Sequence, residues 1–211
     1  MALGDPYAPL DALKGRLGIA ETDTGDDVRL AASLDAASRG IEHCTSRQFK
    51  DAGAASPRTY RPDTPRRVEV DDCSTAAGVL VEVDRAGAGD YGESWSPADY
   101  ALAPAGGVVE GVPGWPFTQI HAIGALVFPL DPRAAWSTAR PRVRVTARWG
   151  WATVPAPIVE ACLIVATEIY KLRDAPFGVA GFGEWGPVRV RQNPIAAAMI
   201  APYERFRVLV G

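Results

Sequence analysis

The stretch of this chain that most constrains its fold runs from residue 141 to residue 173, where an arginine-rich strand pattern leads through two prolines into an apolar helix pattern. In the strand, PRVRVTARWGW, arginines alternate with valine and alanine. Successive side chains of a strand point to opposite faces, so the pattern predicts one packed face and one charged face. The arginines of the charged face are Arg140, Arg142, Arg144 and Arg148.

The helix predicted after this strand begins near Pro157 and ends at about Arg173, since proline is tolerated in a first helical turn. From Ala161 to Ala166 its residues, ACLIVA, are all apolar. A helix that is apolar around most of its circumference must be covered on several sides. The apolar run is far shorter than the roughly 20 residues that a membrane span needs, which leaves a core or a subunit interface and predicts no contact with a membrane.

Two helix patterns precede this region. The first, LDALKGRL, has leucines at helical spacing, and Gly18 is available to close it. The second runs from about Asp26 to Thr45, with Asp26 or Thr24 available as its N-cap. The chain therefore begins with a helical part.

Between residues 56 and 151 the apolar period changes to two, and proline and glycine separate the segments. The candidate strands are RTYR, RVEVD, GVLVEVD, DYALAP, TQIHAIGALVF and RVRVTARW. After the apolar helix come a glycine-rich loop, an extended VRVR segment and a last helix predicted from about Asn193 to Phe206.

This order predicts an α+β fold: a small helical core with a large β-strand insertion and a C-terminal arm that ends in a short helix. The predicted parts are the N-terminal helices (residues 1–55), the β-rich insertion (56–151), the long core helix (152–175), and the glycine-rich loop with the C-terminal arm (176–211).

Charge is segregated along the sequence, although the formal net charge is only −3. Residues 1–46 carry a net charge of −4 and residues 69–99 carry −7, whereas residues 131–150 carry +4 and residues 187–211 carry +3. This alternation suits contacts between copies, and charged faces that pair within one copy explain it equally well. The bases are chiefly arginine, which favours bidentate pairing with carboxylates at protein interfaces over DNA binding.

The sequence offers little for catalysis. Gly181, Gly183 and Gly186 spell GxGxxG, but a long helix precedes them and no βαβ unit surrounds them, as a dinucleotide site would require. His43 and Cys44 are neighbours on a helix and do not face each other, so we expect Cys44 in the core and His43 at the surface. The sequence predicts no enzyme and no cofactor.

A metal site is not predicted either. The three cysteines are Cys44, Cys73 and Cys162, whose odd number and wide spacing suit buried apolar positions better than a disulfide framework or a zinc site. Four aspartates of the insertion could bind calcium, but their spacing matches no EF-hand loop, and turn capping is the commoner role. These are Asp71, Asp72, Asp84 and Asp90.

Six tryptophans stand mostly beside glycine or proline. Trp149 and Trp151 flank Gly150, where strand passes to helix, and we expect them to lock that corner. An alternative function follows from three other aromatic residues of the insertion, which a β-rich module could use to bind carbohydrate or peptide in a concave groove. They are Trp95, Trp115 and Tyr100.

Several motifs occur together in a recognisable order: RLGI, a DD-containing loop, a helix with GIEHCTSRQF, then WGW, VPAPIVEACLIVATEIYK, RDAPFGVAG and PYERF. In this order they resemble the head-tail connector proteins, also called adaptor or head-completion proteins, of long-tailed double-stranded DNA phages and of related gene transfer agents. The resemblance covers residues 7–50 and 141–206, and the middle of the chain is enlarged.

The resemblance implies a structural virion protein without catalytic residues, at the head-tail interface of a particle assembled in the host cytoplasm. It implies a twelvefold ring beneath the portal protein that extends the DNA channel and docks the next connector, stopper or tail terminator. Double-stranded DNA would pass without sequence-specific binding. Twelve copies at −3 each would carry −36, which favours a channel that repels DNA. Candidate channel-lining residues are Asp26, Asp27 and Asp35.

By analogy with the family, residues 188–210 are the candidate arm that grips the portal through its arginines. With the arginine strand, the arm makes up the predicted portal or subunit interface. Its residues are Arg140, Arg142, Arg144, Arg148, Trp149, Trp151, Arg189, Arg191, Tyr203, Arg205, Phe206 and Arg207.

Overall fold

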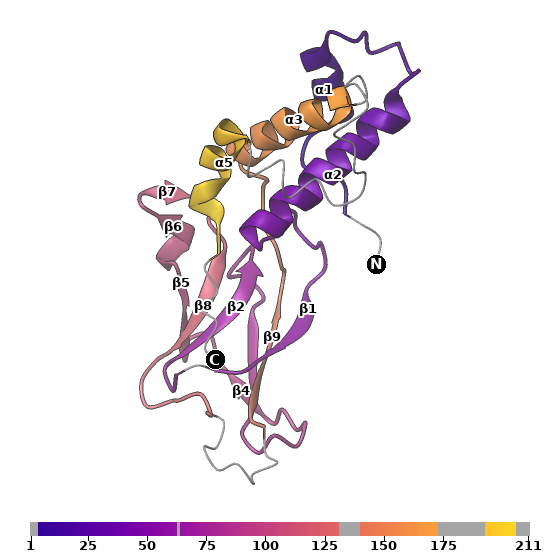
Figure 1. Cartoon of the computed structure of the whole chain (residues 1–211). Coiled ribbons are helices and arrows are strands. Elements are labelled where there is room, and N and C mark those ends of the chain that lie inside the picture. The colour runs from indigo at the N-terminus through magenta and orange to yellow at the C-terminus, as the bar shows by residue number, and fades with distance from the viewer. Residues whose placement is uncertain (1–3, 63, 131–139, 173–192, 206–211) are drawn as a thin grey trace. The chain divides into compact units, whose positions relative to one another are not determined.

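The computed structural model describes residues 4–62, 64–130, 140–172 and 193–205. The chain forms two compact units (Figure 1). Unit 1 combines Met1–Phe49 with Val154–Gly211, and unit 2 consists of Lys50–Thr153. Unit 1 is helical and unit 2 is built from antiparallel strands, which confirms the α+β class with a β-rich insertion.

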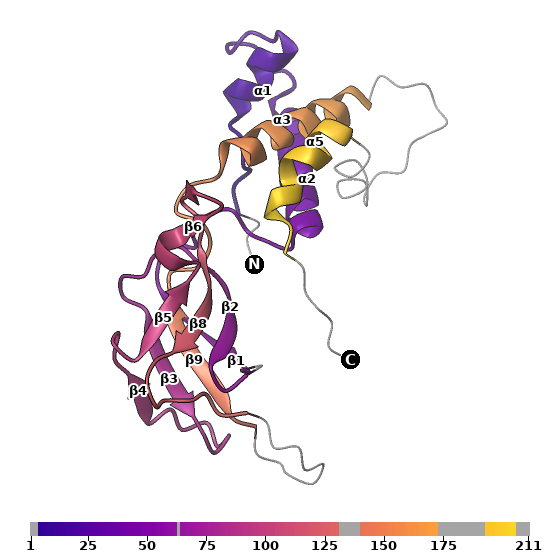
Figure 2. The same cartoon turned by 90° about the vertical axis from the view of Figure 1, so that its left-hand side faces the viewer.

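Unit 1 is organised around one central helix. Helix α3 (Ala156–Lys171) contacts α1 (Leu10–Leu17), α2 (Asp27–Thr45) and α5 (Pro194–Ile200), which is followed by the 3₁₀ turn η3 (Ala201–Tyr203) (Figure 2). Because α3 has neighbours on several sides, its apolar circumference is covered, as its sequence predicts. Its buried residues are Ile158, Ala161, Cys162, Leu163, Val165, Ala166 and Tyr170.

The helix ends follow local chemistry. Gly18 closes α1 in the left-handed conformation, as expected. Asp26 occupies the N-cap position of α2 but makes no capping hydrogen bond with its side chain, so that part of the prediction was wrong. Asn193 caps α5 by accepting from the backbone N–H groups of Ile195 and Ala196. Helix α5 ends at Ile200, earlier than predicted, and Phe206 lies outside the described residues.

Unit 2 contains two antiparallel sheets and a small hairpin. The four-stranded sheet has the order β1 (Ser56–Tyr60), β9 (Arg142–Ala147), β3 (Leu80–Asp84) and β4 (Glu93–Trp95). The three-stranded sheet has the order β2 (Arg67–Cys73), β8 (Phe117–Ala122) and β5 (Tyr100–Ala103). The 3₁₀ turn η1 (Ala105–Gly107) leads into the hairpin of β6 (Val108–Val109) and β7 (Val112–Pro113).

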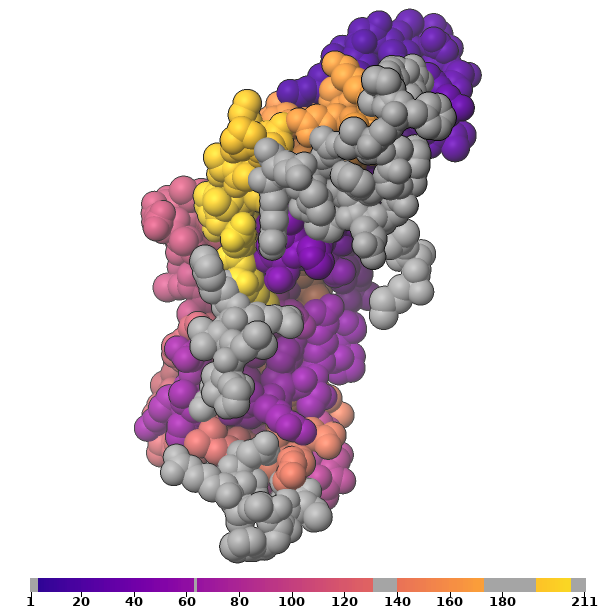
Figure 3. Space-filling view, viewed as in Figure 1, coloured from indigo at the N-terminus to yellow at the C-terminus, as the bar shows by residue number. Residues whose placement is uncertain are grey.

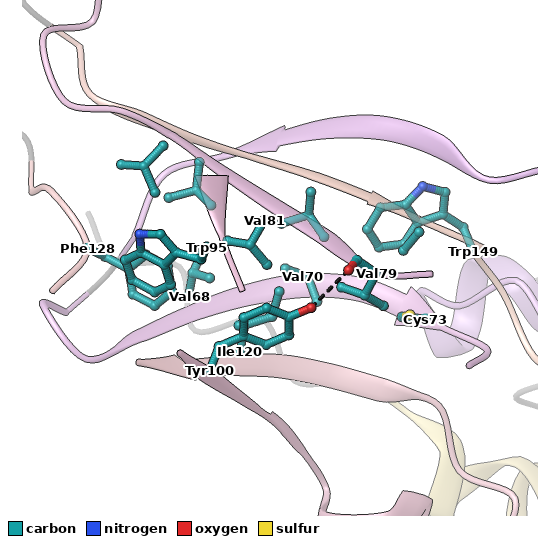
Figure 4. Close-up of a cluster of buried hydrophobic side chains, with 14 residues drawn as sticks. Val68, Val70, Cys73, Val79, Val81, Trp95, Tyr100, Ile120, Phe128 and Trp149 are labelled. Atoms are coloured by element: carbon teal, nitrogen blue, oxygen red, sulfur yellow. Dashed lines mark hydrogen bonds between the residues drawn. The ribbon is translucent and has the colours of Figure 1, made fainter. Parts of the chain in front are cut away.

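The core of unit 2 is formed by side chains from both sheets (Figure 4). Valines of β2, β3 and β9 alternate with polar residues and turn inward, as period-two patterning requires. Trp95 stacks on Phe128 with 4.5 Å between ring centroids. The Tyr100 hydroxyl donates a 2.9 Å hydrogen bond to the Val79 carbonyl, which satisfies the one polar atom of this side chain inside the core.

Six of the strands lie where the sequence predicts them, but three short ones were not predicted. Strands β4, β6 and β7 fall in segments that we read as turns, because two or three residues are too few to show a period. Strand β8 ends at Ala122 rather than Phe128. The Arg66 guanidinium donates to the carbonyls of Gly124 and Leu126, so part of this backbone bonds to a side chain instead of a neighbouring strand.

The turn that follows β9 depends on the backbone of Gly150. This residue has a φ of +100°, and a Cβ atom there would overlap the carbonyl oxygen of Lys50. Its N–H donates a 2.7 Å hydrogen bond to the Asp72 carbonyl, and the Ala52 N–H donates a 2.8 Å bond to the Trp149 carbonyl. Glycine is required at this position for both conformation and space.

Replacing Gly150 tests this corner. We expect Gly150→Ala to lower the free energy of unfolding by more than about 3 kcal/mol, because backbone strain of about 1–3 kcal/mol is joined by a steric clash. Gly114→Ala is the matched control, since Gly114 has a φ of +92° but open space around its Cβ position. Urea unfolding followed by tryptophan fluorescence measures both variants. Equal losses in the two would show that the clash with Lys50 is unimportant.

Candidate interaction surfaces

The outward face of β9 carries its arginines, as the alternation predicts, but they are not all available to a partner. Arg144 forms a bidentate pair with Glu82, which stands opposite it on β3, at 2.8 and 2.7 Å. Its guanidinium also lies over the Tyr91 ring, 4.1 Å from the centroid. Arg144 therefore joins two strands of the same sheet.

The remaining arginines of this group differ in their surroundings. Arg148 is paired with Asp51 within unit 2. Arg142 is exposed, and its guanidinium has no hydrogen-bond or ion-pair partner among the residues that the structure describes. Arg140 is half-buried, and its backbone lies close to Gly87 in the turn after β3. Of the four, Arg142 offers the most accessible charge for a partner.

Hydrogen bonds lower the pKa of three carboxyl groups on β3 and β4. Hydrogen bonds from Arg144 hold the pKa of Glu82 below its usual value. Hydrogen bonds from Arg85 act in the same direction on the pKa of Glu93, at 2.5 and 2.7 Å. Burial alone would raise the pKa of Asp84, but backbone N–H groups of Gly89, Gly87 and Ala88 outweigh it and lower the pKa. Asp84 thus has the turn-capping role that its sequence context predicts.

Two predicted interface residues require a correction. Trp149 is 1% exposed and Trp151 is 3% exposed. The Trp149 indole N–H donates to the Ser56 carbonyl, and the Trp151 indole N–H donates to the Asp72 carboxylate. Both rings are buried parts of the corner at Gly150, which leaves them no surface for a partner, so we remove them from the interface.

The described part of the C-terminal arm is attached to unit 1. The Arg47 guanidinium donates to the Tyr203 carbonyl at 2.8 Å, and the Arg205 N–H donates to the Thr45 carbonyl at 3.0 Å. The Tyr203 ring meets the Phe49 ring edge-on at 5.8 Å. The other predicted interface residues of the arm lie outside the described residues. They are Arg189, Arg191, Phe206 and Arg207.

The acidic residues proposed for a channel lie at the N-cap position of α2 (Asp26) or within that helix (Asp27 and Asp35). The Asp26 carboxylate accepts a 2.6 Å hydrogen bond from the Tyr170 hydroxyl. Asp27 forms an ion pair of 2.5 Å with Lys14, whose side chain is buried. The Asp35 carboxylate has no hydrogen-bond or ion-pair partner among the described residues. Asp26 and Asp27 therefore serve the helical unit itself, whereas the Asp35 side chain makes no such contact among the described residues.

Lys14 is a residue that sequence reasoning missed. Its ammonium group also donates to the carbonyls of Glu21 (3.2 Å) and Asp23 (2.8 Å), so one buried cation orders the loop between α1 and α2. A lysine inside the predicted α1 pattern, followed by an acidic loop, was the available signal. Sequence reasoning also missed the role of Glu82. Its pairing with Arg144 depends on the register of β3 and β9, which the sequence does not show.

The aromatic groove of the alternative function is not formed. Trp95 is 4% exposed and Tyr100 is 7% exposed, and both belong to the core of unit 2. Trp115 is half-buried and tilts against Trp151 at 5.2 Å. Two of the three residues therefore cannot stack on a ligand, which argues against the carbohydrate- or peptide-binding hypothesis.

Other sequence expectations concern cysteines, metals and membranes. The three cysteines are free and buried, and His43 is exposed beside Cys44, as predicted. Across the described ranges, no group of three or more histidine, cysteine or acidic side chains is placed to hold a metal ion. Within those ranges, no helix combines the length and apolar content needed to cross a bilayer.

The chain matches no protein-family model and no curated protein sequence. It does resemble a chain in a solved structure described as "Neck of empty GTA particle computed with C6 symmetry", with 20% sequence identity and a TM-score of 0.56 over 100% of this chain and 96% of that chain. A chain in "Virion of native gene transfer agent (GTA) particle" gives 20% identity and a TM-score of 0.53 over the same shares. The likeness extends over both units and shows a shared fold.

The pair of Arg144 and Glu82 predicts a pH dependence of stability. Because the pKa of Glu82 is lowered in the folded state, its contribution is complete above the ordinary glutamate pKa of about 4.3 and is lost as pH falls through the lower folded pKa. Glu82→Gln removes that contribution, so we expect lower stability at pH 6 and a smaller further loss between pH 6 and pH 3.

Thermal unfolding at these pH values measures the effect. Glu110→Gln is the control, because Glu110 is exposed on the turn of the β6–β7 hairpin and has no ion pair among the described residues. It should follow the wild-type curve. An acid-induced loss in Glu82→Gln as large as that of the wild type would contradict the role of this pair.

Proposed function

We propose that this chain is a structural protein in the neck of a phage-like particle, a gene transfer agent or a long-tailed phage, where it connects head to tail. The observation that carries the proposal is the extent of the fold similarity: one chain of a gene transfer agent neck matches the helical unit and the inserted β unit together. An unrelated module that shared only a common sandwich or helix bundle would match one unit. The motifs of residues 7–50 and 141–206 support the same family.

The proposed role is mechanical and involves no catalysis. A connector must bind its own copies, the portal on the head side and a further neck or tail component on the other side. Unit 1 and unit 2 provide separate folded bodies for such contacts. On this account the ion pairs of the β unit maintain its shape, while exposed residues such as Arg142 are available for partners.

The copy number and the channel are finer parts of the proposal. Sixfold symmetry in the related neck is compatible with six or twelve copies, and we retain the ring of twelve. Double-stranded DNA would pass through it without sequence-specific contacts. Among the acidic residues considered for the channel, Asp35 is the strongest candidate, because Asp26 and Asp27 already bond to Tyr170 and Lys14.

The C-terminal arm is the proposed portal contact. A deletion that tests this contact must leave α5 in place. Ala196 and Ile200 of α5 are buried against unit 1. Removing residues 188–211 would therefore expose part of the core of unit 1 as well as remove the arm. Removing only residues 206–211 leaves α5 and η3 in place and deletes Phe206 and Arg207.

The connector role predicts a specific assembly defect. Particles produced without this chain should accumulate as filled heads and separate tails, and adding the purified chain should restore joined particles in negative-stain images. The chain should appear as a ring at the single vertex that carries the portal. Normal numbers of joined particles in its absence would contradict the proposal.

The arm predicts a separable defect. A chain lacking residues 206–211 should keep the circular dichroism and melting temperature of the full chain but bind portal-bearing heads at least about tenfold more weakly, a change of about 1.4 kcal/mol. The control is Glu204→Gln, a neutral change at an exposed position just before the deletion. Undiminished binding by the shortened chain would show that the arm does not grip the portal.

A further inference from the structure

The segment before α1 is buried although it forms no helix or strand. Within residues 4–9, Tyr7 is 5% exposed and Ala8 is 2% exposed. Irregular segments usually lie at the surface, because water can satisfy their backbone groups there. The strap, as we call residues 4–9, therefore depends on contacts with the rest of unit 1.

Side chains of α2 hold the strap through Tyr7. The Tyr7 N–H donates a 3.0 Å hydrogen bond to the Ser38 hydroxyl, and the Tyr7 hydroxyl donates a 2.5 Å bond to the Glu42 carboxylate. The Arg39 guanidinium pairs with Glu42 at 2.9 Å and lies over the Tyr7 ring, 6.0 Å from its centroid. Burial and the hydrogen bond to Glu42 raise the pKa of Tyr7, so its hydroxyl remains a donor. Three polar side chains thus fix one tyrosine on the helix.

Phe49 is a common neighbour of the strap and of the C-terminal arm, and its side chain is fully buried. The Tyr7 ring meets the Phe49 ring edge-on at 5.7 Å, and the Tyr203 ring meets it edge-on at 5.8 Å. The Tyr7 hydroxyl also accepts a 3.1 Å hydrogen bond from the Phe49 N–H. Tyr7 therefore fixes both the ring and the backbone of Phe49, which in turn supports Tyr203.

The base of the arm, residues 201–205, bonds to the same region of unit 1. Arg47 donates to the Tyr203 carbonyl, and the Arg205 N–H donates to the Thr45 carbonyl. In Figure 3 the surface of α5 and η3, in yellow, lies beside the purple surface at the end of α2. Within the described residues, the chain after η3 belongs to no helix or strand. These contacts therefore fix the direction in which the arm leaves unit 1.

We propose that the strap is a latch for the base of the C-terminal arm. With Tyr7 packed on α2, Phe49 is held in place and supports Tyr203. When the strap is displaced, Phe49 loses one ring contact and the partner of its N–H, and Tyr203 loses its support. The strap and the base of the arm therefore open together, although nearly 200 residues of sequence separate them.

Such coupling is reciprocal. A partner that binds the arm in the position shown also stabilises the strap, by the same factor by which the strap favours that partner. Under the proposed function this partner is the portal, and the strap helps the arm to bind it. The latch itself requires only the folded chain, so it is tested without particles and stands or fails separately from the neck role.

The first test follows hydrogen exchange of single backbone amides in the full chain by NMR. Tyr7→Phe keeps the ring but removes the hydroxyl that bonds to Glu42 and Phe49. Because the buried Phe49 N–H then lacks its partner, the latch should open more often. The Arg205 amide should therefore exchange at least about fivefold faster than in wild type.

Tyr170→Phe is the matched control for this experiment. The Tyr170 hydroxyl also bonds to a carboxylate of unit 1, that of Asp26 at 2.6 Å, but Tyr170 is not part of the latch. In this variant the Arg205 amide should exchange within about twofold of the wild-type rate. Unchanged exchange at Arg205 in Tyr7→Phe, or equal acceleration in both variants, would overturn the inference.

A double-mutant cycle tests whether the coupling reaches the arm. Tyr7→Leu and Tyr203→Leu are made singly and together, and urea unfolding gives the equilibrium constant of each variant. Once Tyr7→Leu has loosened Phe49, the effect of Tyr203→Leu on that constant should be at least about threefold smaller. The effects of Tyr7→Leu and Tyr170→Leu, the control pair, should simply multiply. Effects of Tyr7→Leu and Tyr203→Leu that also multiply would contradict the latch.

Discussion

The architecture depends on the close approach of two backbone segments at Gly150. The β unit is inserted between helices, so its first and last residues must come together for the helical segments on either side to form one unit. Gly150 allows this approach because any Cβ atom there would overlap the Lys50 carbonyl. Trp149 and Trp151 fill the space on either side and bond to the insertion through their indole N–H groups. The requirement is for space and backbone conformation, and no other residue satisfies both.

A second constraint is the apolar circumference of α3. One helix of 16 residues with so few polar positions needs several neighbours, and α1, α2 and α5 supply them. Helix α5, which covers part of α3 with Ala196 and Ile200, is apolar on its exposed side as well, where Ile195 lies. Two arginines in and after β9, Arg144 and Arg148, need no partner from outside, because they form ion pairs with carboxylates of their own unit.

Sequence patterns predicted the α+β class, the main helices and six strands, because these rest on periodicities that persist for several residues. They missed β4, β6 and β7, whose two or three residues cannot display a period. The predicted charged face of β9 was confirmed, but its availability was overestimated, since the pairing of Arg144 with Glu82 depends on strand register across 62 residues of sequence. Trp149 and Trp151 were expected both to lock the corner at Gly150 and to take part in an interface, and their burial fits the first role but leaves no exposed surface for the second. Asn193 was recognisable as a helix start because its capping contacts are local.

The most direct measurement is a cryo-electron microscopy map of the neck of intact particles that contain this chain. The account predicts density next to the portal into which unit 1 and unit 2 fit as separate bodies, repeated six or twelve times around the channel. A neck resolved at side-chain level, with every density accounted for by other chains, would contradict it.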